Sequence, residues 1–249
     1  MSQTLVLDIG NSRMKWGLYG PRGWMSMGVT PNAEIGTLSL RDWQNLPRPV
    51  RVVGVNVAGE AARVRLEAQI ARWRIAPEWL TSSAAACGVV NGYRVPAQLG
   101  ADRWASLIAA RQRVLGAEAI TPAIVVNAGT AVTVDALSGD GRFLGGLIVP
   151  GLRLMLRGLA ENTAALKMTP GAFAAFPDST ADALYTGAMQ AVTGAIEQMR
   201  ALLAHAEQEP RCFLAGGAAN EIAPHLTGAV EVVDNLVLEG VLALADAKA

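Results

Sequence analysis

Cysteine, histidine and aromatic residues are scarce in this chain. Its 249 residues include two cysteines and two histidines, and aromatic side chains make up 5% of the sequence. The two cysteines, Cys87 and Cys212, lie far apart in the sequence. A disulfide framework of the kind that stabilises small secreted proteins needs several pairs of cysteines. The two cysteines also lack the spacing of a zinc site, and the two histidines do not complete one. The sequence therefore supports neither a disulfide framework nor a zinc cluster.

An excess of charge of one sign is also missing. Lysine plus arginine and aspartate plus glutamate number 21 each, and no run of like charge stands out. Nucleic acids and anionic membrane surfaces are bound by basic patches, so we expect neither as a partner. No apolar run reaches the length of a membrane span, and the N-terminus lacks the pattern of a signal peptide. We therefore expect a cytoplasmic protein that acts on small molecules.

Apolar residues, by contrast, are abundant and follow strand and helix patterns. They make up 51% of the chain, which is enough to bury a large core. Turns that contain glycine separate the apolar stretches 4–9, 14–19 and 23–29, and this predicts an antiparallel ribbon. A buried strand over residues 50–57 and a helix over residues 61–73 follow. Such alternation is typical of an α/β layer.

The second half of the sequence repeats this order. Its predicted strands cover residues 123–126, 131–136, 142–149 and 212–214. Apolar residues at helical spacing predict helices over residues 102–115 and 189–203, and a final helix closes the chain. The repetition predicts two similar halves, 1–120 and 121–249, each with a mixed sheet flanked by helices.

Two loops of one design follow buried strands. The first is Asp8-Ile9-Gly10-Asn11-Ser12-Arg13-Met14-Lys15, and the second is Asn127-Ala128-Gly129-Thr130-Ala131-Val132-Thr133-Val134-Asp135. In each loop a glycine lets the backbone turn tightly, so that amides and hydroxyls can face a polyphosphate. One such loop alone would be read as an ordinary turn. The repetition favours a duplicated phosphate clamp.

The side chains of these loops suit phosphate and metal chemistry. Asp8 can hold a magnesium-bound water, and Lys15 can reach a phosphoryl group during its transfer. Asn11 and Ser12 can donate hydrogen bonds to phosphate, and the second loop offers the hydroxyl of Thr130. Neither loop has the spacing of the Walker motif or of the dinucleotide fingerprint.

Asp102 and Arg103 begin the helix predicted over residues 102–115. They can be an acid that favours the helix dipole and an ordinary surface cation. Alternatively, Asp102 accepts a hydroxyl proton, Arg103 pairs with a carboxylate or phosphate, and Gly100 lets a substrate approach closely. A third glycine cluster, residues 215–219, is either a tight strand-to-helix connection or a surface for an adenine ring or ribose.

Five elements of the sequence form one pattern. They are Asp8-Ile9-Gly10-Asn11-Ser12-Arg13-Met14-Lys15, Gly100-Ala101-Asp102-Arg103-Trp104, Gly129-Thr130-Ala131, Gly145-Gly146-Leu147-Ile148-Val149-Pro150-Gly151 and Ala215-Gly216-Gly217. Together they resemble the type III pantothenate kinase family, in the right order and over nearly the whole chain. The first loop is shared with many kinases of the actin, sugar-kinase and chaperone superfamily. Its combination with the Gly-x-Asp-Arg element is specific to this family.

The resemblance implies a duplicated ribonuclease-H-like fold, also described as the actin-like ATPase fold. Residues 1–120 would then carry the first phosphate loop and the substrate motif, and residues 121–249 the second phosphate loop and the adenosine motif. The resemblance also implies a homodimer that uses ATP and Mg²⁺. Its expected activity is phosphorylation of the primary hydroxyl of pantothenate to 4'-phosphopantothenate, the first step of coenzyme A biosynthesis.

Roles for individual residues follow from the same resemblance. Asp102 would be the catalytic base, and Asp8 would hold Mg²⁺ through a water. The residues expected to bind ATP are Asp8, Ile9, Gly10, Asn11, Ser12, Arg13, Met14, Lys15 and Thr130. Those expected to bind pantothenate are Tyr93, Gly100, Ala101, Asp102, Arg103 and Thr180. Thr180 follows Ser179, where the family usually has asparagine.

Asn127 departs from the pattern of the family. The family commonly has aspartate there, and its carboxylate helps to bind a monovalent cation, potassium or ammonium, that the enzyme requires. Asn127 keeps a carbonyl oxygen but loses the charge. The loss weakens the attraction for potassium while leaving one possible ligand.

Two other functions agree with parts of the sequence. A sugar or acetate kinase would share the duplicated nucleotide clamp but not the acceptor. A regulatory protein could retain the fold, and even nucleotide binding, without useful catalysis. The balanced charge argues against direct binding to DNA. The presence of Asp8, Lys15 and Asp102 favours catalysis.

Overall fold

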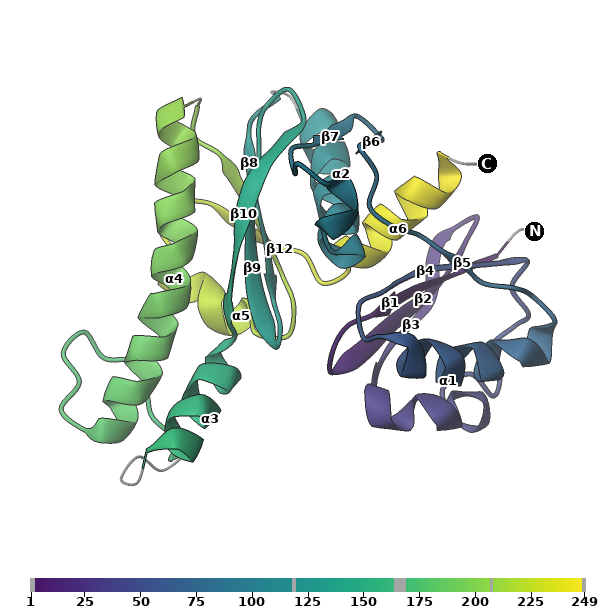
Figure 1. Ribbon diagram of the computed structural model, residues 1–249, viewed down its shortest axis with the longest axis horizontal. Helices are drawn as coiled ribbons and strands as arrows, with labels where there is room; N and C mark the ends of the chain where they lie inside the picture. The colour runs from purple at the N-terminus through teal and green to yellow at the C-terminus, as the bar shows by residue number, and fades with distance from the viewer. Residues whose placement is uncertain (1–2, 118–119, 164–168, 207, 248–249) are drawn as a thin grey trace. The chain divides into compact units, whose positions relative to one another are not determined.

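The computed structural model describes residues 3–117, 120–163, 169–206 and 208–247. By their internal contacts the residues form two compact units. The first comprises Met1–Gln112 with Asn235–Ala249, and the second comprises Arg113–Asp234. Figure 1 shows a sheet with helices packed on it in each unit.

The first unit contains a five-stranded sheet with the order β3-β2-β1-β4-β5. Its strands are β1 (Thr4–Ile9), β2 (Arg13–Gly20), β3 (Gly23–Pro31), β4 (Arg51–Asn56) and β5 (Glu78–Trp79). β1 to β3 form an antiparallel ribbon. β4 joins the free side of β1 in parallel, and β5 joins β4 in parallel. The predicted ribbon and the buried strand after it are confirmed.

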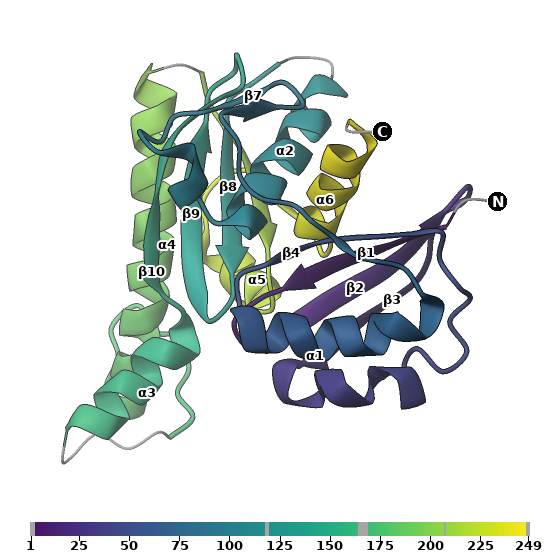
Figure 2. The same ribbon diagram turned by 45° about the vertical axis from the view of Figure 1, so that its right-hand side comes forward.

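The two faces of this sheet have different roles. Leu5, Leu7 and Ile9 of β1 pack in one apolar cluster that also includes residues of the helices η1 (Asn32–Leu40), α1 (Glu60–Ile70) and η2 (Ala71–Trp73). Helix α6 (Leu236–Asp246) packs against β1 and β4, on the side opposite α1 (Figures 1 and 2). Because side chains alternate along a strand, Asp8 points away from the apolar cluster, toward the side of α6.

The remaining elements of the first unit lie between β5 and the second unit in sequence. They are β6 (Ala85–Ala86), β7 (Val89–Asn91), η3 (Pro96–Gln98) and α2 (Ala101–Leu115). β6 and β7 form a short antiparallel pair. α2 confirms the helix predicted over residues 102–115, and Trp104, Leu107 and Ile108 on its apolar face are fully buried. This face anchors the helix, so its first turn is held in place.

The second unit repeats the strand order of the first. Its strands are β8 (Ala123–Ala128), β9 (Ala131–Leu137), β10 (Arg142–Pro150), β11 (Arg211–Ala215) and β12 (Val230–Val232). β8, β9 and β10 form an antiparallel ribbon. β11 joins the other side of β8 in parallel, and β12 joins β11 in parallel. The order β10-β9-β8-β11-β12 therefore matches β3-β2-β1-β4-β5 strand for strand, as a duplication requires.

Helices cover this second sheet as well. They are α3 (Leu152–Asn162), α4 (Thr180–Ala206), α5 (Ala219–Ile222) and the short η4 (Ala223–His225). α4 runs along one face of the sheet (Figure 2), where Met189, Val192 and Ile196 join the apolar cluster formed by β8, β9 and β11. The stripe predicted over residues 189–203 is thus confirmed as the buried side of α4. Among the described residues, no helix combines the length and apolar character needed to cross a membrane.

The compact units differ from the two expected halves, 1–120 and 121–249, at the C-terminus. α6 follows β12 in sequence but belongs to the first unit, where it covers β1 and β4. The compact units are defined by contacts, whereas the duplicated halves are defined by repetition of the strand order. Their boundaries therefore need not fall at the same residue. The boundary between the duplicated halves stays a prediction.

Candidate active site

The end of β1 brings two charged residues of the first loop onto one face of the sheet. Asp8 on β1 and Lys15 on β2 are direct partners in the antiparallel register, so their side chains point to the same side. That side is opposite the apolar cluster, which contains their neighbours Ile9, Met14 and Trp16. The pairing of the two strands therefore sets an acid and a base next to each other on the face of the sheet that α6 covers.

The carboxyl group of Asp8 is in an unusual environment. Its Oδ1 atom is buried and has no hydrogen-bond partner among the described residues. Burial, followed by the negative charge of Asp102, raises the pKa of Asp8 from 3.8 to about 7, and the positive charge of Lys15 opposes this rise. The influence of Asp102 means that the two carboxylates lie within electrostatic reach of each other. A buried acceptor without a donor is suited to a water held by a metal ion.

Asp102 is held at the first turn of α2. Its Oδ1 accepts a hydrogen bond of 2.8 Å from the backbone N–H of Arg103, and the hydroxyl of Ser106 donates to its backbone carbonyl. Burial raises the pKa of Asp102, while the N–H and the charge of Arg103 act in the opposite direction. A carboxylate whose pKa is raised accepts a proton more readily than an ordinary aspartate does.

Gly100 makes room for this carboxylate. A Cβ atom at residue 100 would lie 2.6 Å from Oδ1 of Asp102, which is well inside van der Waals contact. The glycine of the Gly-x-Asp-Arg element therefore permits the orientation of Asp102 itself. The sequence suggested only that Gly100 leaves room for a substrate.

Arg103 is joined to Tyr93. Its guanidinium donates a hydrogen bond of 3.1 Å to the Tyr93 hydroxyl and lies 5.7 Å from the centre of the tyrosine ring. The Arg103 side chain is buried. The loop that carries Tyr93 is shaped by Asn91, which donates to the carbonyls of Ser83 and Pro96 and accepts from the N–H of Tyr93. Two residues expected at a substrate pocket thus come together.

The other residues of the first loop divide into core and surface. Ile9 and Met14 are fully buried in the apolar cluster, so only their backbone groups remain for a ligand. Asn11, Ser12 and Arg13 are exposed. A hydrogen bond of 3.1 Å from the N–H of Gly10 to the carbonyl of Arg13 closes the turn. Sequence patterns had not singled out Asn32, which donates to the carbonyls of Gly10 and Asn11.

In the second unit, three glycine-bearing segments converge. The N–H of Gly151 donates to the carbonyl of Thr130, and the N–H of Ala218 donates to the carbonyl of Ala128. Gly216 has a positive φ of +104°, and a Cβ there would lie 2.4 Å from the Ala128 carbonyl. Only glycine allows this approach without strain. The loop of residues 127–135 therefore packs against both glycine clusters that the sequence had shown separately.

Asn127 and Thr180 also lie in the second unit. Asn127 is the penultimate residue of β8 and is paired in register with Thr133 of β9. The hydroxyl of Thr133 is buried without a hydrogen-bond partner among the described residues. Thr180 is exposed at the start of α4. Its turn is tied by Asp182, which accepts from the N–H of Ala172 and the hydroxyl of Ser179. These bonds hold the pKa of Asp182 below its usual range.

The structure thus gathers the predicted residues into several groups. In the first unit, Asp8 is electrostatically coupled to both Lys15 and Asp102, and Arg103 contacts Tyr93. In the second unit, Thr130 lies in a loop bounded by two glycine segments. Asn32 and Asn91 were missed as site residues because side-chain bonds to distant carbonyls leave no local pattern. Their residue type, which favours turns, was the only available signal.

A carboxylate of raised pKa, a lysine and a second carboxylate at a helix start can together hold a metal-bound phosphate and remove a proton. Other proteins with this fold have been solved. A Baf family protein from Campylobacter jejuni is 21% identical to this chain, with a TM-score of 0.63 over 97% of both chains. The ethanolamine utilization protein EutJ from Carboxydothermus hydrogenoformans is 12% identical, with a TM-score of 0.51 over 98% of this chain and 90% of that one. At these identities the likeness concerns the fold alone.

The duplicated strand order and these solved structures define the class. The protein has the duplicated ribonuclease-H-like fold of the actin-like ATPases, as the sequence predicted. Sequence comparison defines the family within this class. The sequence profile of the family described as type III pantothenate kinase matches residues 4–201. The type III pantothenate kinase of Nitrosospira multiformis is 49% identical over 246 residues, which are 97% of this chain and 90% of that protein. The chain belongs to the type III pantothenate kinase family.

We expect Asp8→Asn to stabilise the metal-free protein at pH 8. Because the pKa of Asp8 is raised on folding to about 7, the folded state binds this proton more tightly than the unfolded state. The stability of the wild type therefore falls as the pH rises from about 4 through 7. A rise in pKa from 3.8 to about 7 lowers the free energy of unfolding above pH 7 by on the order of 4 kcal/mol. Urea unfolding with a chelator, at pH 5 and pH 8, measures the effect.

The gain from Asp8→Asn should be clearly smaller at pH 5, where the wild-type carboxyl is protonated in the folded state. Asp182→Asn is the matched control, because hydrogen bonds lower the pKa of Asp182. Its wild-type contribution is present above the ordinary pKa and is lost on acidification. Asp182→Asn should therefore lower the stability at pH 8. An equal gain from Asp8→Asn at both pH values would contradict the assignment.

Proposed function

We propose that the protein transfers the γ-phosphoryl group of ATP to the primary hydroxyl of pantothenate. The product is 4'-phosphopantothenate, and the reaction is the first step of coenzyme A biosynthesis. Membership of the type III pantothenate kinase family supports this activity. The observation that carries it is the pairing of Asp8 with Lys15 on one face of the sheet, with Asp102 close enough to raise the pKa of Asp8, because phosphoryl transfer needs charge neutralisation beside a proton acceptor.

Asp102 is the general base of this proposal. It accepts the proton of the pantothenate hydroxyl as that oxygen bonds to the γ-phosphorus and the bond to the ADP oxygen breaks. Its position at the first turn of α2 and its raised pKa support the role. The hydrogen bond from the N–H of Arg103 fixes one carboxylate oxygen, which leaves the other oxygen for the substrate.

Asp8 and Lys15 are assigned to the phosphates. Mg²⁺ would be held by Asp8 through a water and would neutralise charge on the β- and γ-phosphates. The unpartnered Oδ1 of Asp8 fits such a ligand. Among the described residues, no group of three or more His, Cys, Asp or Glu side chains could hold a metal ion by itself. Lys15 supplies a positive charge on the same face of the sheet.

Arg103 and Tyr93 are assigned to pantothenate. Pantothenate carries a carboxylate, and a guanidinium can pair with it through two hydrogen bonds. The bond from Arg103 to Tyr93 holds the guanidinium plane. Gly100 and Ala101 form the backbone beside Asp102 and complete the proposed pocket. Thr180 of the second unit is assigned to pantothenate on the family resemblance alone.

The second unit is assigned to the nucleotide and to a monovalent cation. Thr130 lies in the loop held by Gly151 and Gly216, which supports a contact with ATP. Asn127 would offer its carbonyl oxygen to potassium or ammonium, opposite the buried hydroxyl of Thr133. Without a carboxylate, such a cation would be held weakly. We also propose that the protein acts in the cytoplasm, where coenzyme A is made.

Replacement of Asp102 by asparagine tests the activity. Asp102→Asn keeps the shape of the side chain and removes the base, so we expect kcat with pantothenate to fall by at least about a hundredfold. A coupled assay that follows ADP measures turnover with pantothenate, Mg-ATP and potassium, ammonium or sodium.

Sugars and acetate serve as alternative acceptors in the same assay. Wild-type turnover should occur with pantothenate and not with these acceptors. Turnover of a sugar or acetate in place of pantothenate would contradict the proposed function. Turnover of Asp102→Asn near the wild-type rate would contradict the role of its carboxylate.

Gly100→Ala tests the geometry of the same residue. The added Cβ would collide with Oδ1 of Asp102, so the carboxylate must move, and we expect kcat to fall by at least about tenfold. Gly36→Ala is the matched control, because a Cβ at Gly36 meets nothing within 4 Å. It should leave kcat unchanged. Wild-type kcat in Gly100→Ala would show that the orientation of Asp102 is not needed.

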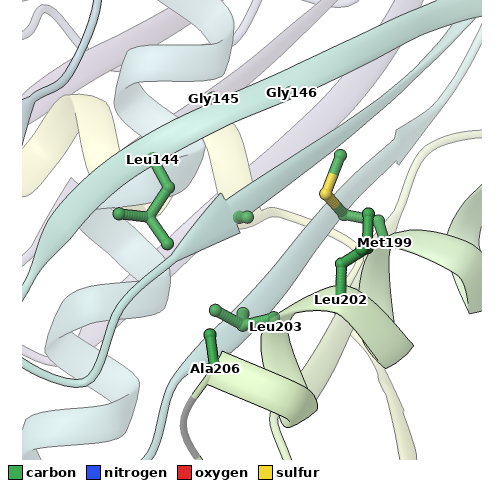
Figure 3. Close-up of a pocket in the computed structure, with 8 residues that line it drawn as sticks. Leu144, Gly145, Gly146, Met199, Leu202, Leu203 and Ala206 are labelled. Atoms are coloured by element: carbon green, nitrogen blue, oxygen red, sulfur yellow. The ribbon is translucent and has the colours of Figure 1, made fainter.

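We further propose that the protein is a homodimer. The second unit has an apolar pocket of about 290 Å³ between β10 and the end of α4, and Figure 3 shows Leu144, Met199, Leu202 and Leu203 around it. Leu144 is 50% exposed and Leu202 is 58% exposed. Exposed apolar side chains of this kind support contact with a second copy of the chain.

Leu144→Glu with Leu202→Glu should convert the dimer to a monomer, because two charges would then have to be buried at the interface. Sedimentation equilibrium measures the mass of both forms. Leu40→Glu is the matched control, since Leu40 is 75% exposed on η1 of the first unit; it should leave the mass unchanged. A monomeric wild type, or a double variant that remains a dimer, would contradict this interface.

A further inference from the structure

Asn32, the first residue of η1, is hydrogen-bonded to the first loop. Its Nδ2 donates to the carbonyl of Gly10 at 2.8 Å and to the carbonyl of Asn11 at 3.0 Å. Its backbone N–H donates to the carbonyl of Ser12 at 3.1 Å. Three consecutive carbonyls of the loop are therefore bound by one residue that is about twenty positions away in sequence.

These bonds determine where the loop amides point. In a planar trans peptide, the C=O and the N–H of the same unit point in opposite directions. The carbonyl of Gly10 belongs to the same peptide unit as the N–H of Asn11, and the carbonyl of Asn11 to that of Ser12. By holding the two carbonyls toward itself, Asn32 directs the two N–H groups to the opposite side. Consecutive amides aimed to one side form an anion-binding surface.

The amide orientation of Asn32 follows from its partners. Two carbonyl oxygens can accept only from Nδ2, so Oδ1 must point elsewhere. Oδ1 is buried and has no hydrogen-bond partner among the described residues. A buried acceptor without a donor is unfavourable, and a residue kept only for stability would avoid it. The two bonds to the loop carbonyls explain why asparagine is present despite this penalty.

We propose that Asn32 is a positioning residue for the phosphates of ATP. It acts through the loop, by presenting the N–H groups of Asn11 and Ser12 to the phosphates. The inference rests on the proposed function, because it takes ATP as the nucleotide and assigns the first loop to its phosphates. It predicts that Asn32 affects nucleotide binding without affecting pantothenate.

Asn32→Ala removes the two side-chain bonds. We expect KM for ATP, and Kd for a fluorescent ATP analogue with Mg²⁺, to rise about tenfold, since two hydrogen bonds that orient the loop are lost. KM for pantothenate should stay within about twofold of the wild-type value. Asn32→Asp keeps the side-chain shape, loses both donors and should show the same pattern. If Asn32→Ala melts at a clearly lower temperature than the wild type, Asn32→Asp takes its place in the test.

Two control variants separate this role from a general effect on folding. Thr37→Val removes an exposed side-chain bond of the same helix, from Thr37 to the Glu34 carbonyl, and should change neither KM. Asn91→Asp removes the bonds that Asn91 donates to the carbonyls of Ser83 and Pro96. It should raise KM for pantothenate and leave KM for ATP unchanged.

The results also distinguish this inference from the proposed function. A wild type that binds the ATP analogue but does not phosphorylate pantothenate contradicts the proposed function, and Kd still tests Asn32. Unchanged Kd and KM for ATP in both Asn32 variants would overturn the role of Asn32. Equal rises in both KM values, or a wild type that binds no ATP analogue, would overturn it too.

Discussion

The buried carboxyl group of Asp8 is the constraint on which the rest of the site depends. Burial and the charge of Asp102 make its ionised form unfavourable, and Lys15 compensates only in part. An ionised Asp8 therefore needs a further positive charge close by. Folding alone does not relieve this penalty, which supports the proposal that a metal ion and the phosphates of a nucleotide bind beside Asp8.

The sheet explains how this unfavourable group is tolerated. Alternation along β1 sends Leu5, Leu7 and Ile9 into the apolar cluster under α1, and the same alternation turns Asp8 to the other side. The burial of these apolar side chains stabilises the strand that carries the unfavourable carboxylate of Asp8. Lys15 reaches the same side because β2 pairs in a register that places it opposite Asp8. Asp8 and Lys15 therefore share the face of the sheet that α6 covers, where Val6 of β1 is also fully buried.

The loops of the two units are held in different ways, by close backbone approach in the second unit and by a side chain in the first. Gly216 packs against the Ala128 carbonyl, and Gly151 donates to the Thr130 carbonyl. In the first unit, the loop carbonyls are held by the side chain of Asn32. The two units therefore repeat one strand order but stabilise their loops by different means.

The sequence by itself determined the positions of the main strands, the antiparallel ribbon of the first unit, the position of α2 and the residues of both loops. Period-two and helical apolar patterns are local, and the loop motifs are contiguous, so each can be recognised without coordinates. It also marked Asp8, Lys15 and Asp102. Only the tertiary structure decided that Asp102 acts on the pKa of Asp8, that Gly100 makes room for a carboxylate, and that Asn32 and Asn91 hold their loops. The effect of Asp102 on Asp8 and the bonds of Asn32 join residues far apart in the chain. The room at Gly100 and the bonds of Asn91 depend on the local backbone conformation. A pattern of residue types records neither.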